Sequence, residues 1–425
     1  LGGPVRSGAL KLDDRNALLF EMTDEVAALV LRNNYLQTLA ISLAERNGLE
    51  DLASRQRLMQ TLEGRGLLDR AVEFLPDDAE LAERRRRGQA LTRPELAVLL
   101  AYAKLTLFAD LVETSVPDDP YLGKELTRYF PAELSRLYPD ELEHHRLRRE
   151  IIATHLTNSI INRGGPSLIA RMTDETGASA DRIARAFAAV RDSYGMVELN
   201  AQIDALDNKV AGALQLDLYA AVKRLLIDRM VWFIRNVDLD RGLMAVVEHY
   251  GSGIEQVAQA LDAALTDEAA VARNARAAEL MKSGVPERLA MRIASLPALT
   301  VAPDIVLVAD KTGREVPDVA RTFLAVVRYF RLERIANDAR EISAADYFDR
   351  LALDRARDHL AGAARRLTAD VLKGGAGFEA MDAWVKPRHA EVERIRTAMH
   401  EIADTGLTLS KLSVAASLLG DLAGR

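Results

Sequence analysis

Hydrophobic residues recur along this chain at intervals of three and four positions, which is the period of an α-helix with one buried face. The pattern is clearest over residues 91–165. A helix is predicted to begin at Thr92, because Thr92 and Glu95 form a Thr-x-x-Glu capping box and Pro94 suits the first turn. Its apolar positions are Leu96, Leu99, Leu100, Ala103 and Leu107. Strand signals are poor throughout, so we predict an all-α, multi-helical fold.

A second helix is predicted from Pro139 to a strong stop signal at Gly164-Gly165-Pro166. Its apolar stripe is Leu147, Ile151, Ile152, Leu156 and Ile160. These positions recur at helical spacing, so we expect them to pack inward as one buried face.

Near the start of the chain, a long helix is predicted from Thr23 to about Arg46, ended by Asn47-Gly48. Its apolar residues Val26, Leu29, Val30, Leu36, Leu39 and Leu43 share one broad face. A polar patch interrupts that face: Asn33, Asn34, Tyr35, Gln37 and Thr38. Either the patch packs beside another polar surface of the chain, or it stays partly exposed and meets a partner.

The segment 173–194 matches the segment 309–330 at a constant offset of 136 positions. We interpret this as an internal duplication of roughly residues 164–265 and 300–400, each copy a small helical lobe. Gly177 and Gly313 are expected at equivalent helix ends, where a left-handed residue is favoured. The predicted division of the whole chain is 1–90, 91–165, a first lobe at 166–298 and a second lobe at 299–425.

Composition narrows the function. Lys and Arg number 56 against 63 Asp and Glu, a net charge of −7, which argues against a general binder of polyanions. The basic run Arg84–Arg87 is expected to be a solvated face neutralised by nearby acids. There is no Cys, so disulfides and thiolate sites are excluded. No apolar run approaches a membrane span and no signal peptide is visible, so a cytoplasmic location is the expectation.

No motif for chemistry emerges. The Gly-rich segments 251–253 and 374–377 do not follow strands, and we expect linkers or helix stops there. Glu141 and His144 have the spacing of a di-iron ligand pair, but no second pair exists. We therefore assign no catalytic, cofactor-binding or metal-binding residue. The helix–turn–helix pattern of the repeat leaves a nucleic-acid-binding alternative, in which these arginines would face a groove: Arg182, Arg185, Arg191, Arg321 and Arg328.

Long ungapped motifs carry a resemblance: MTDEVAALVLRNNYLQTLA, LTRPELAVLLAYAK and ATHLTNSIINRGG. They resemble the C-terminal helical region of the large bacterial NAD-specific glutamate dehydrogenases, over essentially the whole chain. The resemblance implies a parent enzyme that uses NAD. The active-site Lys and Asp and the dinucleotide-binding fold are expected upstream of Leu1, with no cofactor in this region. The absence of an initiator Met fits a piece of a longer polypeptide.

The resemblance also implies partners. We expect the upstream dehydrogenase module of the same polypeptide and a homo-oligomer, with no nucleic acid and no membrane. The polar patch on the helix Thr23–Arg46 is a candidate docking surface for that module. A scaffold or regulatory role is the favoured function. The alternatives are an independent helical protein-interaction or helix-turn-helix nucleic-acid-binding module, and a helical enzyme with an unrecognised site.

Overall fold

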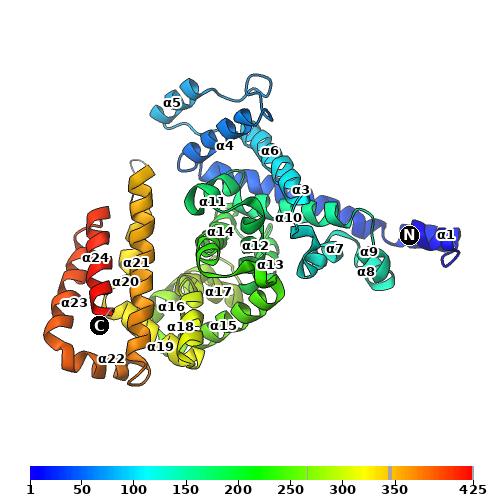
Figure 1. Ribbon diagram of the computed structural model, residues 1–425. Helices are drawn as coiled ribbons and strands as arrows, with labels where there is room; N and C mark the ends of the chain where they lie inside the picture. The colour runs from blue at the N-terminus through cyan, green and yellow to red at the C-terminus, as the bar shows by residue number, and fades with distance from the viewer. Residues whose placement is uncertain (266, 343–346, 424–425) are drawn as a thin grey trace. The chain divides into compact units, whose positions relative to one another are not determined.

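The computed structural model describes residues 1–265, 267–342 and 347–423, so residues 343–346 and 424–425 of the predicted second lobe lie outside the described residues. The described residues form helices and no strand, which confirms the all-α prediction (Figure 1). The chain divides into two compact units, Leu1–Glu248 and His249–Arg425. The division into four segments stays a prediction.

The first unit holds fourteen α-helices and three short 3₁₀ helices among its residues. They are α1 (Gly2–Ser7), α2 (Leu12–Glu21), α3 (Thr23–Arg46), α4 (Leu52–Gly64), α5 (Asp78–Arg86), α6 (Arg93–Val112), η1 (Val116–Asp118), η2 (Pro120–Gly123), α7 (Lys124–Tyr129), α8 (Ala132–Leu137), α9 (Pro139–Glu143), α10 (Arg148–Gly164), α11 (Leu168–Thr176), α12 (Ala180–Ser193), α13 (Met196–Asp204), α14 (Gly212–Asn236) and η3 (Leu239–Arg241).

The remaining helices begin with α15, which starts just before the boundary and continues into the second unit. They are α15 (Leu243–Ala264), α16 (Asp267–Lys282), α17 (Glu287–Leu299), α18 (Ala302–Thr312), α19 (Val316–Tyr329), α20 (Leu332–Glu341), α21 (Tyr347–Val371), α22 (Gly377–Val385), η4 (Lys386–Arg388), α23 (His389–Asp404) and α24 (Leu409–Ala423).

The core of the first unit is built where α10 packs on α6 and α12 packs on α14. The predicted capping box is present at the start of α6, where the Thr92 N–H donates to Glu95 Oε2 at 2.7 Å. The five predicted apolar positions of α6 are all buried. The region after Pro139 differs from the prediction, because it forms two helices, α9 and α10. The segment between them is largely polar and its Leu147 is 44% exposed, so it offers little apolar surface to hold one continuous helix.

The two predicted copies share their local geometry. Gly177 and Gly313 both end helices in the left-handed conformation, with φ of 70° and 63°, as expected. Arg331 has φ of 51°, and the residue 136 positions before it is Gly195, with φ of 58°. The pairs α11–α12, α12–α13, α12–α14, α11–α14 and α13–α14 are in contact, and so are the corresponding pairs among α18–α21. These features support our proposal that the segments are an internal repeat.

The Gly-rich segment 251–253 lies inside α15, so the prediction of a linker or helix stop there was wrong. A Cβ atom at Gly253 would lie 2.4 Å from Val306 Cγ2, so the missing side chain lets α15 approach α18 closely. The segment 374–377 does connect two helices, α21 and α22, as predicted. No single described helix is long and apolar enough to cross a membrane, although the bent pair α17 and α18 together meets those criteria by length and composition.

Candidate functional site

The polar patch predicted on α3 is mostly open to solvent. Asn33, Asn34, Gln37 and Thr38 are exposed, and Tyr35 is half-buried. Thr38 Oγ1 donates to the Tyr35 carbonyl within the same helix, at 2.9 Å. Within the described residues, no hydrogen-bond partner is seen for the three amide side chains. The three amides therefore make no polar side-chain contact that is seen within the described residues.

Tyr35 has a different role from its neighbours in the patch. Its hydroxyl donates to Asp207 Oδ1 at 3.1 Å and lies 3.3 Å from the Tyr219 hydroxyl. Burial, together with the carboxylates of Asp207 and Asp204, raises the pKa of Tyr35 above its ordinary value. Arg32 forms an ion pair with Asp204 one turn earlier on α3. Tyr35 thus fastens α3 to α14 and to the segment between α13 and α14, through contacts that are not seen for the amides of the patch.

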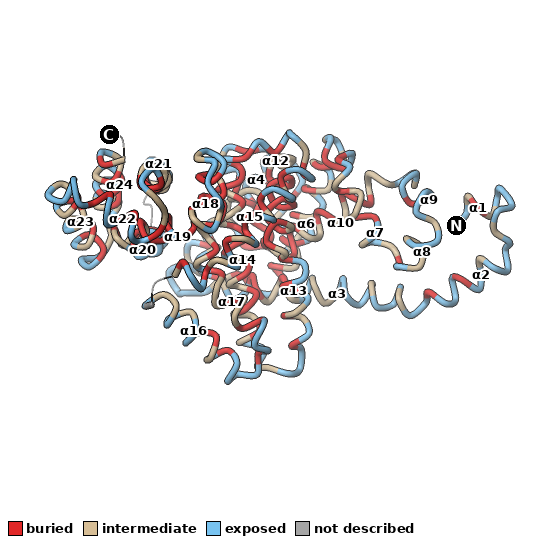
Figure 2. The backbone as a smooth tube through the Cα atoms, turned by 90° about the horizontal axis from the view of Figure 1, so that it is seen from below, coloured by how far each residue is buried: buried red, intermediate tan, exposed pale blue. Residues whose placement is uncertain are grey.

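Apolar side chains lie exposed on α2 and on the first half of α3. In Figure 2 the backbone of these two helices is mostly pale blue or tan, the colours of exposed and intermediate residues. Of the predicted apolar face of α3, Leu43 is buried, whereas Val26 and Val30 are 45% and 56% exposed. Phe20 and Leu31 are 82% and 67% exposed. Large apolar side chains left exposed along one segment are typical of a surface that contacts another protein segment.

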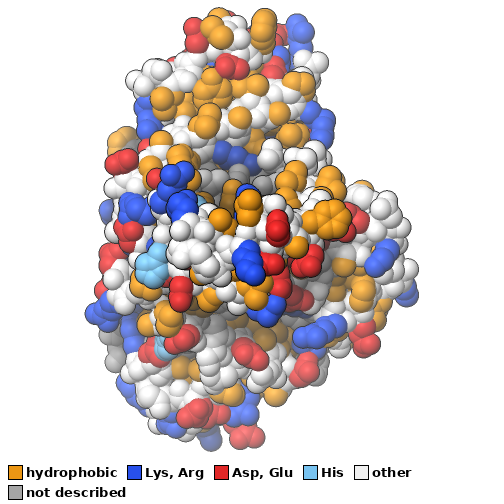
Figure 3. Space-filling model, turned by 90° about the vertical axis from the view of Figure 1, so that its right-hand side faces the viewer, with side chains coloured by type: hydrophobic (Ala, Val, Ile, Leu, Met, Phe, Trp, Pro, Cys, Tyr) orange, Lys and Arg blue, Asp and Glu red, His pale blue; other side chains and the backbone are white. Residues whose placement is uncertain are grey.

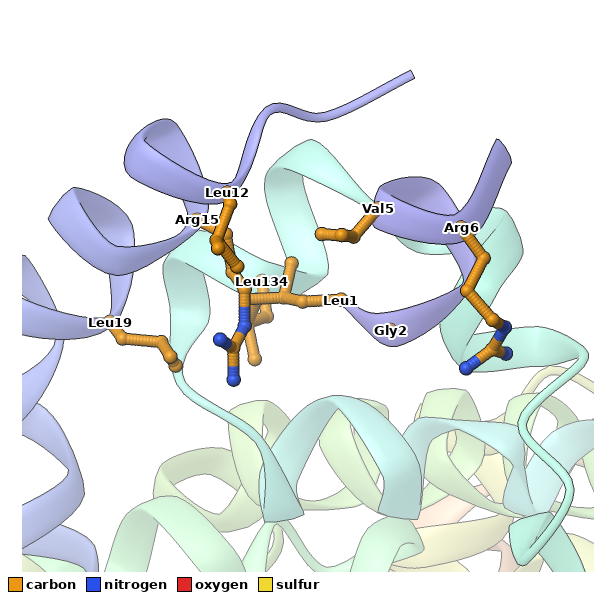
Figure 4. Close-up of a pocket in the computed structure, with 8 residues that line it drawn as sticks. All are labelled: Leu1, Gly2, Val5, Arg6, Leu12, Arg15, Leu19 and Leu134. Carbon is orange, nitrogen blue, oxygen red and sulfur yellow. The ribbon is translucent and has the colours of Figure 1, made fainter. Parts of the chain in front are cut away.

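The same end of the first unit contains an open apolar groove of about 530 Å³. Its walls come from α1, α2 and α8, and Figure 4 shows side chains of Leu1, Leu12 and Leu134 gathered around it. The groove is held in place partly by α3, because Glu25 Oε1 accepts a hydrogen bond of 2.7 Å from the backbone N–H of Ala132 at the start of α8. Figure 3, which faces the end of the unit where α1 lies, shows hydrophobic side chains exposed between charged ones.

We call the exposed side chains of α2 and α3 the N-terminal apolar face. Its members are Leu12, Leu19, Phe20, Val26, Val30 and Leu31. Sequence reasoning had singled out only Val26 and Val30 among them, and it assigned them to a helix face without deciding whether that face is covered. The signal that could have found the others is the presence of large apolar residues on more than one side of α2 and α3.

Of the five arginines that the nucleic-acid-binding alternative requires, Arg185 and Arg191 are buried, Arg182 is half-buried, and Arg321 and Arg328 are exposed. Arg185 is 9% exposed and its Nη1 donates to Asp119 at 2.7 Å. Arg182 Nη2 donates to the Ile234 carbonyl at 2.9 Å. Arg191 is 5% exposed. In the second copy, Arg321 pairs with Asp318 and the Arg328 guanidinium lies over the Phe378 ring. The three arginines of the first copy are thus committed to contacts within their own unit, which argues against this alternative.

Three of the four arginines in the basic run at the end of α5 form ion pairs with nearby glutamates. Arg84 donates to both carboxylate oxygens of Glu95 at 2.9 Å and also pairs with Glu80. Arg86 and Arg87 both pair with Glu83. Glu80, Glu83 and Glu95 thus offset part of the positive charge of the run.

A buried ionic network connects α7, α10 and α12 behind the N-terminal helices. Glu125 is fully buried, and its carboxylate accepts hydrogen bonds from Arg128 at 2.8 Å, Arg191 at 2.7 Å and His155 at 2.5 Å. Burial opposes ionisation of Glu125, but the hydrogen bond from His155 and the charges of Arg191 and Arg128 outweigh it and hold its pKa below the ordinary value. The network is fully paired, so its role is to join the helices.

The described residues contain no group of three or more His, Asp or Glu side chains arranged to hold a metal ion. Glu141 and His144 lie on and after the short exposed helix α9, and His144 Nδ1 contacts the Asp140 carbonyl at 2.8 Å. The arrangement that stands out is therefore a surface suited to protein contact, with an apolar face and open amides side by side on α3.

Two known protein families match different parts of the chain. Residues 88–421 match the family described as glutamate dehydrogenase, C-terminal. Residues 1–44 match the bacterial NAD-glutamate dehydrogenase catalytic domain. The catalytic-domain match therefore ends within α3 and contains the whole N-terminal apolar face.

Individual proteins named NAD-specific glutamate dehydrogenase are similar to the chain. The protein from Pseudomonas aeruginosa is 37% identical over 99% of this chain and 26% of its own length. The protein from Halomonas elongata is 36% identical over 94% of this chain and 25% of its own length. The protein from Mycobacterium tuberculosis is 29% identical over 97% of this chain and 26% of its own length. The chain spans about a quarter of the length of these curated relatives. Because the C-terminal family model covers well over half of its residues, the chain belongs to the glutamate dehydrogenase C-terminal family.

Proposed function

We propose that this chain is the C-terminal helical scaffold of an NAD-dependent glutamate dehydrogenase. Such an enzyme oxidatively deaminates L-glutamate to 2-oxoglutarate and ammonia and passes hydride to NAD. The names of the relatives support this parent activity. The described residues lack the strand, Gly-rich turn and helix that bind a dinucleotide. NAD and the reacting groups would therefore belong to the rest of the catalytic domain, with this chain in a structural role.

One observation carries the proposal: the segment that matches the catalytic domain leaves several of its large apolar side chains uncovered. Residues 1–44 include Phe20 and Leu31, which are 82% and 67% exposed. Fully burying a side chain of this kind is worth about 1.5–3 kcal/mol. The remainder of the catalytic domain would cover this face in the longer polypeptide, and the open amides of α3 would find their partners there.

The proposed contact joins the two matched regions through α3. The first half of α3 would complete the catalytic domain, while its second half packs on α6 and α10 of the scaffold. A displacement of the scaffold would therefore be transmitted directly to the domain that performs the chemistry. Self-association into a homo-oligomer and a cytoplasmic location are further parts of this proposal.

Two matched substitutions in the complete enzyme test it. Leu31 on α3 is 67% exposed and Leu105 on α6 is 66% exposed, but only Leu31 lies in the N-terminal apolar face. Leu31→Asp would place a charge in the proposed contact, so we expect at least a tenfold loss of glutamate-dependent NAD reduction. Leu105→Asp should leave that rate nearly unchanged. Equal rates for Leu31→Asp and the parent enzyme would overturn the docking proposal.

A further inference from the structure

A second cavity, of about 210 Å³, lies elsewhere in the first unit, between the end of α3, the α10–α11 turn and α14. Unlike the apolar groove, it has a predominantly charged lining, with Arg46, Arg171, Lys223 and Arg224 among its residues. Nothing in the proposed scaffold role uses these side chains. The cavity is large enough for a small ion and several waters, since one water occupies about 30 Å³.

Gly164 and Ser167, the two ends of the turn that joins α10 to α11, line the cavity. Gly165 has φ of 93°, a conformation that favours glycine. Ser167 is the N-cap residue of α11, and regular bonding in that helix begins with the Arg171 N–H donating to the Ser167 carbonyl at 2.9 Å. The Leu168 N–H donates to the Gly165 carbonyl at 3.3 Å, so the donors open to an anion are the N–H groups that follow it in the first turn of α11, at the positive end of the helix dipole.

Ser167 adds an independent reason to expect a ligand. Its side chain lines the cavity, although the residue is only 7% exposed. No described residue forms a hydrogen bond with its hydroxyl. The hydroxyl is accessible from the cavity, so a water molecule or a ligand there can satisfy it.

Lys223 on α14 completes the arrangement. Its Nζ lies over the turn, because a Cβ atom added at Gly165 would be 3.4 Å from it. Among the described residues, the ammonium group has neither an ion-pair partner nor a hydrogen-bond acceptor. Burial lowers the pKa of Lys223, against the opposing charge of Asp51. An anion in the cavity would supply the acceptor that this amine lacks.

The other charges limit what can bind. Arg171 is paired with Glu175 at 2.9 Å, and Arg46 is paired with Asp217. Acidic side chains also line the cavity: Glu50, Asp51 and Asp228. They would repel an extended polyanion. A small anion close to the turn would instead meet Ser167, Lys223 and the start of α11.

We propose that this cavity binds a small oxyanion, a phosphate or carboxylate group, held by the Ser167 hydroxyl, the Lys223 ammonium group and the first N–H groups of α11. The volume accommodates inorganic phosphate or a small dicarboxylate and is too small for a dinucleotide. This site is separate from the N-terminal apolar face and does not depend on the proposed dehydrogenase activity.

Calorimetric titration of the chain with inorganic phosphate, and separately with succinate, tests the proposal and distinguishes the two sources of an oxyanion. We expect saturable binding of at least one, weakened about tenfold or more by Lys223→Met and less by Ser167→Ala. Lys209→Met is the control, since Lys209 is an exposed lysine outside the cavity. Absence of binding by both anions, or equal affinity in Lys223→Met, would overturn the proposal.

A second measurement needs no variant that could fail to fold. Limited acetylation of amines in the unmodified chain, read by mass spectrometry, gives the reaction rate of each lysine. The bound anion should slow acetylation of Lys223 at least several-fold and leave Lys209 unchanged. If saturating phosphate and succinate both leave the Lys223 rate unaltered, the site does not exist as described.

Discussion

The ionic network around Glu125 gives the sharpest stability prediction. Glu125→Gln keeps the shape of the side chain but removes the charge that accepts hydrogen bonds from Arg128, Arg191 and His155. Arg191 is 5% exposed and would retain only Asp192, which accepts from its Nε at 2.8 Å. Removing one member of a buried ion pair typically costs about 3–5 kcal/mol. Because Asp192 remains, we expect the free energy of unfolding to fall by an amount near the lower end of this range, about 3 kcal/mol.

The fluorescence signal of urea unfolding can be limited to the first unit, because the chain has two tryptophans, Trp232 in the first unit and Trp384 in the second. In a Trp384→Phe background, Trp232 fluorescence reports the first unit alone. Glu133→Gln is the control: Glu133 and Arg136 form an exposed pair on α8, and its loss should have little effect. A Glu125→Gln loss below about 1 kcal/mol, the range of surface pairs, would refute the reasoning.

The same pair of proteins predicts a pH dependence. The pKa of Glu125 is lowered from 4.5 in the folded state, so folding favours its ionised form. The stabilisation is therefore present in full above the ordinary glutamate pKa and is lost as pH falls through the lower folded value. The difference in unfolding free energy between parent and Glu125→Gln should be constant from pH 7 to 5 and shrink in stronger acid. A constant difference throughout would show that Glu125 is not held ionised by its neighbours.

Three further predictions concern single features. Burial lowers the pKa of Lys104 from 10.5 to about 8, and its Nζ has no hydrogen-bond partner among the described residues. Between these two pH values the unfolded state binds more protons than the folded state, so the free energy of unfolding should rise from pH 8 to 10.5. Urea unfolding of Lys104→Met should lack this rise. Gly177→Ala and Gly313→Ala should each cost about 1 kcal/mol from backbone strain alone, since each added Cβ meets open space; markedly unequal costs would weaken the proposed repeat. Asn34→Ala with Gln37→Ala should leave the melting temperature of this chain nearly unchanged and lower activity in the complete enzyme; a drop of several degrees would place these amides in the local core.

Local signals predicted the helices well. The capping box at Thr92, the helix Thr23–Arg46 and the left-handed ends at Gly177 and Gly313 depend on residues close together in sequence. The failures involve contacts between distant residues. Gly253 lies inside a helix that packs closely on α18, and no residue near Gly253 in the sequence indicates that Val306 contacts it.

The candidate surfaces were only partly predictable for the same reason. Periodicity placed Val26 and Val30 on an apolar face, but whether a face is covered depends on what packs against it, so their exposure was not predictable. Tyr35 looked like its polar neighbours, yet its hydroxyl reaches Asp207, far away in sequence. The proposed oxyanion site depends on Ser167, at the start of α11, and Lys223, on α14, lining the same cavity, and this could not be predicted from residues so far apart in the sequence.

Hydrogen–deuterium exchange of residues 12–38 tests the central claim most directly. The first half of α3 has little packing in this chain, so its backbone amides should open and exchange quickly when the chain is alone. In the complete polypeptide, docking of the N-terminal apolar face on the catalytic domain should slow the same amides by at least tenfold, while residues 96–107 of α6 exchange equally slowly in both. Equal exchange of residues 12–38 in both proteins would contradict the account.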